Sequence, residues 1–291
     1  MALSEFDAIV NSSGFDDYSV IQDADDDLDG GAYMLYVKAG TYAGFTVSTT
    51  NVYIFCEPGT VITGAVVLSG AGVCLQMGAG SDIQALTTLS GIGNSLICEN
   101  GVDLDGVTCT GASCYVTGGG WDTISDGGTS VDGATLNAAD IILENIAVQT
   151  TAGGGNSLDG VSVEDDRIIL SQVKVIDSDN RAIFSVGSTD TDALIMGCVI
   201  LGSDARGMHF TGARSRLIGN YLINTGNDGI LFEASGDDSV AVGNVVQDQG
   251  NQSVEIDTNA ENCVIVGNRL DGAVTDNSGT STVALNDATS F

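Results

Sequence analysis

The chain has 291 residues, of which 43% are apolar, and it contains 40 glycines but a single proline. With 39 acidic and 8 basic residues its formal net charge is -31, so its surface repels nucleic acid and anionic membranes. No run of 18 apolar residues occurs, so no membrane insertion is expected, and the N-terminus lacks the basic and apolar regions of a secretory signal peptide.

The charge comes mostly from Asp, and Lys is almost absent. Repulsion between these carboxylates is costly at ordinary ionic strength, but it fades near molar salt, where the Debye length is about 3 Å. An Asp excess with little Lys is typical of proteins from extreme halophiles and favours a halophilic, archaeal setting. An acidic surface that attracts divalent cations, in a marine source, is the alternative.

Cysteine usage argues against a disulfide framework. The chain has seven cysteines, an odd number, and no CxxC pair. Cys109 and Cys114 lie five residues apart without a nearby histidine, so a zinc site is not expected. Buried free thiols are the predicted state.

Residues 1–42 are predicted to form an N-terminal cap. Ile21, Ala24 and Leu28 recur at helical spacing in an Asp-rich stretch, and a Gly-Gly pair ends the helix before a strand at 33–37. The open end of a solenoid exposes core side chains and an unpaired strand, so some element must cover it. This helix is the expected cover.

Apolar strands then repeat along the chain. In the first half, apolar runs lie about 20 residues apart, at 51–62, 72–83, 94–104 and 113–124. In the second half, two independent series recur every 22–26 residues. The first series comprises 141–148, 167–175, 193–201, 216–223, 240–246 and 264–270. The second comprises 160–164, 182–186, 207–211, 229–233 and 253–257.

Matching periods in two series predict an all-β fold, a right-handed parallel β-helix in which each coil stacks on the one before. About ten coils are expected over 43–275, with a C-terminal tail over 276–291. The second series alternates as strands do, and its predicted core residues are Val161, Val163, Ile183, Met208, Phe210, Ile230, Phe232, Val254 and Ile256.

A polar residue recurs at the centre of each first-series segment. Stacked side-chain amides can pair with one another and satisfy backbone groups of the turns. We therefore predict an inward ladder whose members are structural: Asn145, Gln172, Cys198, Asn220, Asn244 and Asn268.

Three N-terminal segments carry a resemblance to a known group. DYSVIQDA (17–24), GGAYMLYVKAGTY (30–42) and NVYIFCEPGTVI (51–62) resemble the start of the pectate-lyase-like β-helix superfamily, which includes viral tailspikes. In that superfamily a capping helix with an IQ-A pattern precedes the strand that opens the β-helix. The resemblance implies the fold rather than one activity, because the superfamily includes lyases, hydrolases, epimerases and non-catalytic adhesins.

A first group of candidate site residues lies in the turns before the second-series strands. Stacking places Asp159, Arg181, Arg206, Asp228 and Gln252 in one column. This lattice is either a carbohydrate or calcium site or a ladder of surface ion pairs. Its candidate ligand-binding residues are Asp179, Arg181, Asp204, Arg206 and Asp228.

A second group lies on the outward side of the same strands. His209, the single histidine, is expected about one coil spacing of 4.8 Å from Glu233 and close to Glu255 and Asp257. Paired carboxylates are what glycoside hydrolysis requires, so these four are the catalytic candidates. In a chain this acidic, carboxylates also meet by chance.

Apolar residues on this outward side suggest a different use. Phe184, Val186 and Leu231 are predicted to face outward, and exposed apolar patches commonly mark contacts between subunits. These three residues are the predicted subunit interface.

The leading functional hypothesis is an extracellular virion protein, a spike, fibre or capsid turret that recognises host surface glycans or glycoproteins. The resemblance implies a homo-oligomer, a trimer by preference and a pentamer at a capsid vertex, in contact with other virion proteins. A polysaccharide lyase or glycoside hydrolase on the same scaffold and a non-binding capsid decoration protein are the alternatives. Because the few aromatic residues are expected mostly at inward or cap positions, a sugar-stacking groove is not favoured, and the hypothesis leans away from an enzyme. No cofactor is predicted apart from surface-bound calcium or other cations.

Overall fold

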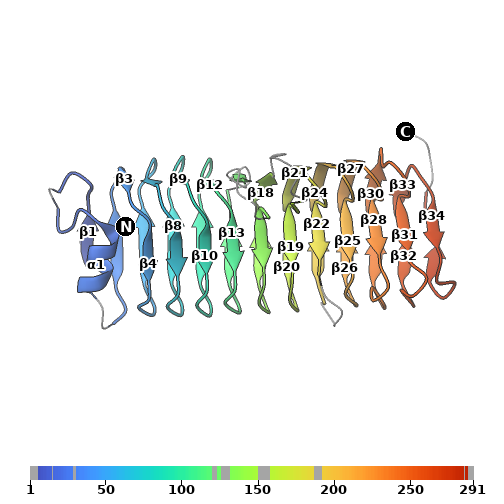
Figure 1. Cartoon of the computed structure of the whole chain (residues 1–291), viewed down its shortest axis with the longest axis horizontal. Coiled ribbons are helices and arrows are strands. Elements are labelled where there is room, and N and C mark those ends of the chain that lie inside the picture. Colours follow the sequence, from blue (N-terminus) through green and yellow to red (C-terminus); the bar gives the residue numbers. More distant parts are fainter. Residues whose placement is uncertain are drawn as a thin grey trace.

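The structure, a computed structural model, describes residues 6–14, 16–28, 31–119, 123–125, 132–149, 158–186, 192–284 and 286–287. Its strands pair in parallel into three long sheets that wind into one elongated β-helix (Figure 1). Sheet A has thirteen strands, and sheets B and C have eleven each. The predicted all-β parallel β-helix is confirmed.

Each coil contributes one strand to each sheet. Sheet A contains β1 (Ala8–Val10), β2 (Met34–Val37), β5 (Tyr53–Cys56), β8 (Cys74–Met77), β11 (Ser95–Cys98), β14 (Tyr115–Thr117), β17 (Ile142–Glu144), β20 (Ile169–Ser171), β23 (Leu194–Met196), β26 (Arg216–Ile218), β29 (Val240–Val242), β32 (Val264–Val266) and β35 (Thr282–Ala284). Sheet B contains β3 (Thr41–Tyr42), β6 (Val61–Ile62), β9 (Asp82–Ile83), β12 (Asp103–Leu104), β15 (Thr123–Ser125), β18 (Ala147–Gln149), β21 (Lys174–Ser178), β24 (Val199–Ser203), β27 (Tyr221–Thr225), β30 (Val245–Gln247) and β33 (Arg269–Leu270). Sheet C contains β4 (Phe45–Val47), β7 (Val66–Leu68), β10 (Thr87–Leu89), β13 (Val107–Cys109), β16 (Ala134–Leu136), β19 (Val161–Val163), β22 (Ile183–Ser185), β25 (Met208–Phe210), β28 (Ile230–Phe232), β31 (Val254–Ile256) and β34 (Val274–Asp276).

The core fills the space between the three sheets with stacked columns of side chains. Alternation along each strand points one set of residues inward, and all nine core residues predicted from the second series are fully buried. Phe210 and Phe232 stack in adjacent coils with ring centroids 5.9 Å apart. Equivalent apolar residues therefore lie on one another along the solenoid, which buries a continuous core.

The polar ladder forms in the C-terminal coils. Asn220, Asn244, Asn268 and Asn286 are linked by amide hydrogen bonds, each Nδ2 lying 3.0 Å from the Oδ1 of the next. Cys198 begins the run, because its backbone N–H donates to Asn220 Oδ1 at 2.9 Å. For these residues the predicted inward ladder is correct.

For Asn145 and Gln172 the ladder prediction is wrong by one residue. Pairing of β17 with β20 and of β20 with β23 puts both residues in register with Gly197, and Cys198 instead aligns with the buried Val173. Asn145 and Gln172 have positive φ values of 52° and 54°, as Gly197 does at 61°. They occupy the left-handed turn position, which Gly and Asn adopt most readily.

The N-terminal end is covered as predicted. Helix α1 (Ile21–Asp27) buries Ile21 and Ala24 and contacts β4, the terminal strand of sheet C. Gln22 receives a hydrogen bond from the backbone N–H of Thr46 at 2.8 Å and donates to its carbonyl at 3.1 Å. The glutamine of the IQ-A pattern thus satisfies a strand edge that would otherwise be unpaired.

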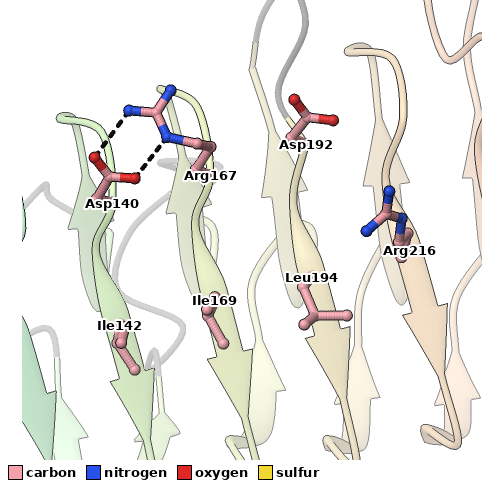
Figure 2. A pocket seen from close by; sticks show the side chains of 7 residues that line it. All are labelled: Asp140, Ile142, Arg167, Ile169, Asp192, Leu194 and Arg216. Atoms are coloured by element: carbon pink, nitrogen blue, oxygen red, sulfur yellow. Dashed lines mark hydrogen bonds and ion pairs between the residues drawn. The ribbon is translucent and has the colours of Figure 1, made fainter.

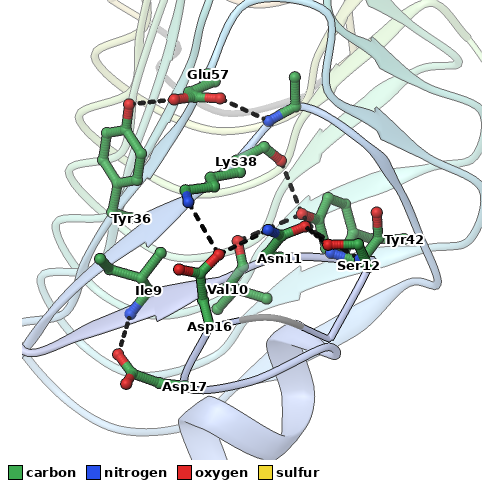
Figure 3. Close-up of polar contacts among 12 residues, drawn as sticks. Ile9, Val10, Asn11, Ser12, Asp16, Asp17, Tyr36, Lys38, Tyr42 and Glu57 are labelled. Atoms are coloured by element: carbon green, nitrogen blue, oxygen red, sulfur yellow. Dashed lines mark hydrogen bonds and ion pairs between the residues drawn. The ribbon is translucent and has the colours of Figure 1, made fainter.

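Strand β1 was not predicted, and it adds a further strand to sheet A next to β2. Its connection to α1 is fastened by polar contacts, shown in Figure 3. Lys38 donates to Asp16 at 2.9 Å, and the Tyr42 hydroxyl accepts from the backbone of Ser12 and donates to the carbonyl of Lys38.

At the other end, β34 and β35 continue the stack. Strand β35 pairs with β32 and lies in the segment that the sequence assigns to a tail. No helix among the described residues is long and apolar enough to cross a membrane.

Candidate functional site

The outward side of sheet C, from β19 to β31, and the turns that precede these strands hold the sequence-predicted site residues; we call this surface the sheet C face. Register pairing stacks Val161, Ile183, Met208, Ile230 and Val254. Two residues earlier in each coil, the predicted column forms as expected, with members Asp159, Arg181, Arg206, Asp228 and Gln252.

The arginines of this column are ion-paired to its aspartates. Arg181 contacts both carboxylate oxygens of Asp159 at 2.8 Å, and Asp159 is almost fully buried. Arg206 lies 3.3 Å from the equally buried Asp228, which also accepts from the side-chain amide of Asn251 at 2.9 Å. The pairs hold two guanidinium groups in fixed positions at the edge of the face.

The column itself supplies carboxylates to its arginines: Asp159 pairs with Arg181, and Asp228 pairs with Arg206. Of the two aspartates predicted beside the arginines, Asp179 is half-buried and Asp204 is exposed.

The two groups of candidates meet in three dimensions. The Arg181 guanidinium lies 3.2 Å from the ring centroid of Phe184, and the Phe184 and His209 rings are 5.1 Å apart. His209 Nε2 is 2.8 Å from a carboxylate oxygen of Glu233. One continuous cluster thus runs from the arginine column across an aromatic ring to the single histidine, an arrangement in which a cation over a ring face is favourable.

His209 is buried although its side chain points away from the core. Burial lowers the pKa of its imidazole; the Glu233 carboxylate opposes this shift, and the positive charges of Arg206 and Arg181 add to it. A neutral imidazole at pH 7 donates from Nε2–H to Glu233, which leaves Nδ1 as an acceptor. Nδ1 is buried and has no hydrogen-bond partner among the described residues, so the site contains an unused acceptor.

The single histidine gives a direct pH prediction. Its imidazole should titrate below the ordinary value of 6.5 in an NMR titration of the folded protein. Because the unfolded chain then binds the proton more readily, the contribution of His209 to stability is complete above the unfolded pKa and is lost as the pH falls from there through the lower folded pKa. Glu233→Gln removes the group that raises the pKa and should move the midpoint lower still. A wild-type midpoint above 6.5, or an upward move in Glu233→Gln, would show that this electrostatic account is mistaken.

The remaining catalytic candidates, Glu255 and Asp257, lie at the C-terminal side of the cluster. Glu255 lies in register with Leu231 of the preceding coil, and Asp257 follows two residues later on the same side. Burial raises the pKa of Glu255, and the negative charges of Asp228 and Asp257 raise it further, whereas Arg206 lowers it. A carboxyl group with a raised pKa is suited to hold a proton, as a general acid does.

The predicted interface residues differ in their surroundings. Leu231 is buried, and Phe184 is half-buried beneath Arg181, so both form part of the cluster. Val186 is 40% exposed. A subunit contact at these three residues stays a prediction.

A second Arg–Asp ladder, missed in the sequence, lies at the turn before sheet A. Asp140, Arg167, Asp192 and Arg214 occupy equivalent positions with positive φ, and they pair through two-contact ion pairs at 2.6–2.9 Å. Arg strains the backbone at such a position, where Gly or Asn is usual. The sequence did carry a signal for this ladder, because Asp and Arg alternate at intervals of one coil.

Two cavities lie on the outward side of sheet A rather than on the sheet C face. The first, of about 530 Å³, has an apolar floor of Ile142, Ile169 and Leu194 beneath this ladder and Arg216 (Figure 2). The second, of about 360 Å³, is lined by Phe6, Tyr36, Tyr53, Phe55 and Gln76.

The aromatic cavity lies where the sequence had not predicted one. Tyr53 and Phe55 belong to the coils, not to the cap, and they point outward with Tyr36, whose ring stacks on Phe55 with centroids 5.6 Å apart. The register of the first-half coils could not be read from the sequence, so this outward cluster was not predicted.

Metal binding finds no support in the described part of the chain. Within it, no group of three or more His, Cys, Asp or Glu side chains is arranged to hold an ion. The acidic surface therefore lacks a described metal centre.

Residues 154–288 match the family described as right-handed β-helix region, which confirms the predicted handedness. No curated protein sequence matches the chain significantly. Among solved structures, a tailspike protein of Escherichia coli bacteriophage HK620, in complex with a pentasaccharide, is similar with a TM-score of 0.63 at 10% identity, over 91% of this chain and 60% of the tailspike chain. The ORF18 protein of Geobacillus virus E2 has a TM-score of 0.57 at 13% identity, over 91% of this chain and 55% of its own.

A bacterial protein module is similar to this chain over nearly the full length of the module. The A-module of the mannuronan C-5 epimerase of Azotobacter vinelandii has a TM-score of 0.54 at 13% identity, over 91% of this chain and 88% of the module. All three identities are low, so these similarities establish the fold alone. The chain spans only 55–60% of the length of the two viral proteins.

Proposed function

We propose that this protein is an extracellular virion spike or fibre that binds a host surface glycan through the sheet C face without cleaving it. The observation that carries the proposal is the cluster in which Arg181 lies over Phe184 beside the buried His209. It combines an aromatic ring, guanidinium donors held by ion pairs and the partly exposed Glu233 carboxylate on the flank of a rod. Sites of this kind orient polar ligands through a few placed polar groups.

The chemistry of the cluster suits a glycan better than an apolar ligand. Sugar hydroxyl groups both donate and accept hydrogen bonds, so they can accept from the arginines and donate to the partly exposed Glu233 carboxylate. Coils repeat at about 4.8 Å, which offers an extended oligosaccharide similar groups at regular steps. The fold similarity to a tailspike solved with a pentasaccharide supports this proposal.

We further propose that the protein works as a homo-oligomer, preferably a trimer, joined to other virion proteins. We also propose a high-salt environment, because the net charge is -31 and like charges are stacked in adjacent coils. Asp82 and Asp103 are paired in register on β9 and β12, and the pKa of Asp103 is raised by burial and then by Asp82 and Asp105. Such repulsion is tolerable where salt screens it.

The alternative is a polysaccharide-cleaving enzyme on the same face. The specific observation in its favour is Glu255, whose raised pKa suits a proton donor, with Asp257 directly after the same strand and Glu233 in the adjacent coil. Glycoside hydrolysis uses two carboxyl groups in such complementary roles. The epimerase similarity likewise leaves sugar chemistry open as a proposal.

Incubation with microbial surface polysaccharides separates the two functions. We expect the purified protein to cosediment with a polysaccharide whose chain length, measured by size-exclusion chromatography, stays unchanged. Glu255→Gln should retain this binding, because the residue lies beyond the Arg181–Phe184–His209 cluster. If the wild-type protein shortens the polysaccharide and Glu255→Gln does not, the adhesin proposal is wrong and the enzyme proposal is supported.

A further inference from the structure

The outward residues on the strands of sheet A are mostly uncharged, and charged side chains lie in the flanking turns; we call this surface the sheet A face. On strands β1 to β35 of this sheet, outward residues alternate with buried ones, and Glu144 and Arg216 are the charged residues among those that point outward. In a chain with 39 acidic residues, a face of this length with only these two charged outward residues on its described strands is unusual.

Large apolar side chains are exposed on this face. Met196, Ile218 and Val242 lie in register on β23, β26 and β29 and are 38%, 45% and 37% exposed. The floor of the larger cavity adds Ile169 and Leu194 to the same surface (Figure 2). Apolar surface left in water is unfavourable by about 25 cal/mol per Å², so a partner that covers it gains free energy.

We infer that the sheet A face is the surface through which copies of this chain associate side by side. A second copy fits for two reasons. Two chains of charge -31 repel each other least where few carboxylates meet. On the strands of this face Glu144 is the one outward carboxylate, and the flanking Asp140 and Asp192 are each paired with an arginine. The face also runs the length of the rod, so an equally long and straight partner covers it best, and a parallel or antiparallel copy is such a partner.

The size of the face agrees with a stable contact. Thirteen strands at about 4.8 Å each make it about 60 Å long, and two outward residues per strand make it about 10 Å wide. The resulting area of about 600 Å² is close to the roughly 800 Å² that each partner buries in a standard interface. This inference goes beyond the proposed glycan binding and does not depend on it. It also locates the contact on a different face from the sequence-predicted residues Phe184, Val186 and Leu231.

Matched substitutions distinguish the two faces. Ile218→Glu places one charge on the sheet A face, and Val186→Glu places the same charge on the sheet C face at a site of similar exposure, 45% against 40%. In multimolar salt, sedimentation equilibrium should show an oligomer for the wild type and for Val186→Glu. Ile218→Glu should weaken association at least tenfold, with unchanged far-UV circular dichroism.

A native thiol provides a second readout at the other end of the face. Cys74 points outward from β8 and is half-buried, whereas the other six cysteines are buried. Its alkylation should slow as the wild-type protein is concentrated into the oligomer, and Ile218→Glu should restore the rate. A monomeric wild type, dissociation by Val186→Glu in place of Ile218→Glu, or a Cys74 rate independent of concentration would each overturn the inference.

Discussion

Replacing Asn244 with Ala should lower the free energy of unfolding by about 3–5 kcal/mol, the largest effect expected of a single polar substitution in this chain. The Asn244 amide accepts from the backbone and the side chain of Asn220 and donates to Asn268 Oδ1 and to the carbonyl of Leu217. All four contacts are buried. Removing the amide leaves several buried polar groups unsatisfied, each at about 1–3 kcal/mol.

Asn145→Gly is the control for the ladder. Asn145 sits at a left-handed turn position with φ 52°, where Gly is unstrained, and the structure describes no side-chain hydrogen bond for it. Its substitution should change stability by less than about 1 kcal/mol in urea denaturation. Equal losses in the two variants would mean that the ladder includes Asn145 after all, as the sequence pattern had suggested.

Salt should have the second large effect. Moving from low to multimolar NaCl is expected to raise the melting temperature by about 10 °C, because screening at a Debye length of about 3 Å relieves several kcal/mol of repulsion. Circular dichroism melts measure this shift. Asp103→Asn provides the internal check, since it removes one member of the stacked pair with Asp82.

The check works through the difference between the two salt conditions. Asp103→Asn should raise the melting temperature at low salt and should have little effect in multimolar salt, where the repulsion is already screened. An unchanged wild-type melting temperature across this range would end the proposal of a high-salt environment.

Much of the fold could be predicted because a solenoid repeats its rules in every coil. Strand alternation identified the inward residues, including Phe210 and Phe232, and the spacing of the two series gave the stacking. The register error at Gln172 has a physical cause. Asn and Gln suit both an amide ladder and a left-handed turn, so the residue type alone did not determine the alignment. The alignment is determined by the pairing of β20 with β23.

The site was predictable in its parts and not in its connections. The stacked column and the position of His209 beside Glu233 followed from register. The reach of Arg181 over Phe184 did not, because a long side chain can span three residues along the chain in many directions. The sheet A face was not predicted for another reason: only the second-series strands alternate clearly enough in the sequence to assign their outward residues.

The affinity of Phe184→Ala for a polysaccharide that the wild type binds tests the central claim most directly. Phe184 supports Arg181 and contacts the His209 ring, so its truncation should weaken binding at least tenfold in isothermal titration calorimetry. Val67→Ala, at the equivalent outward position of β7 and far along the solenoid, should bind as the wild type does. Equal affinities of Phe184→Ala and Val67→Ala, with both variants folded, would contradict glycan binding at the sheet C face.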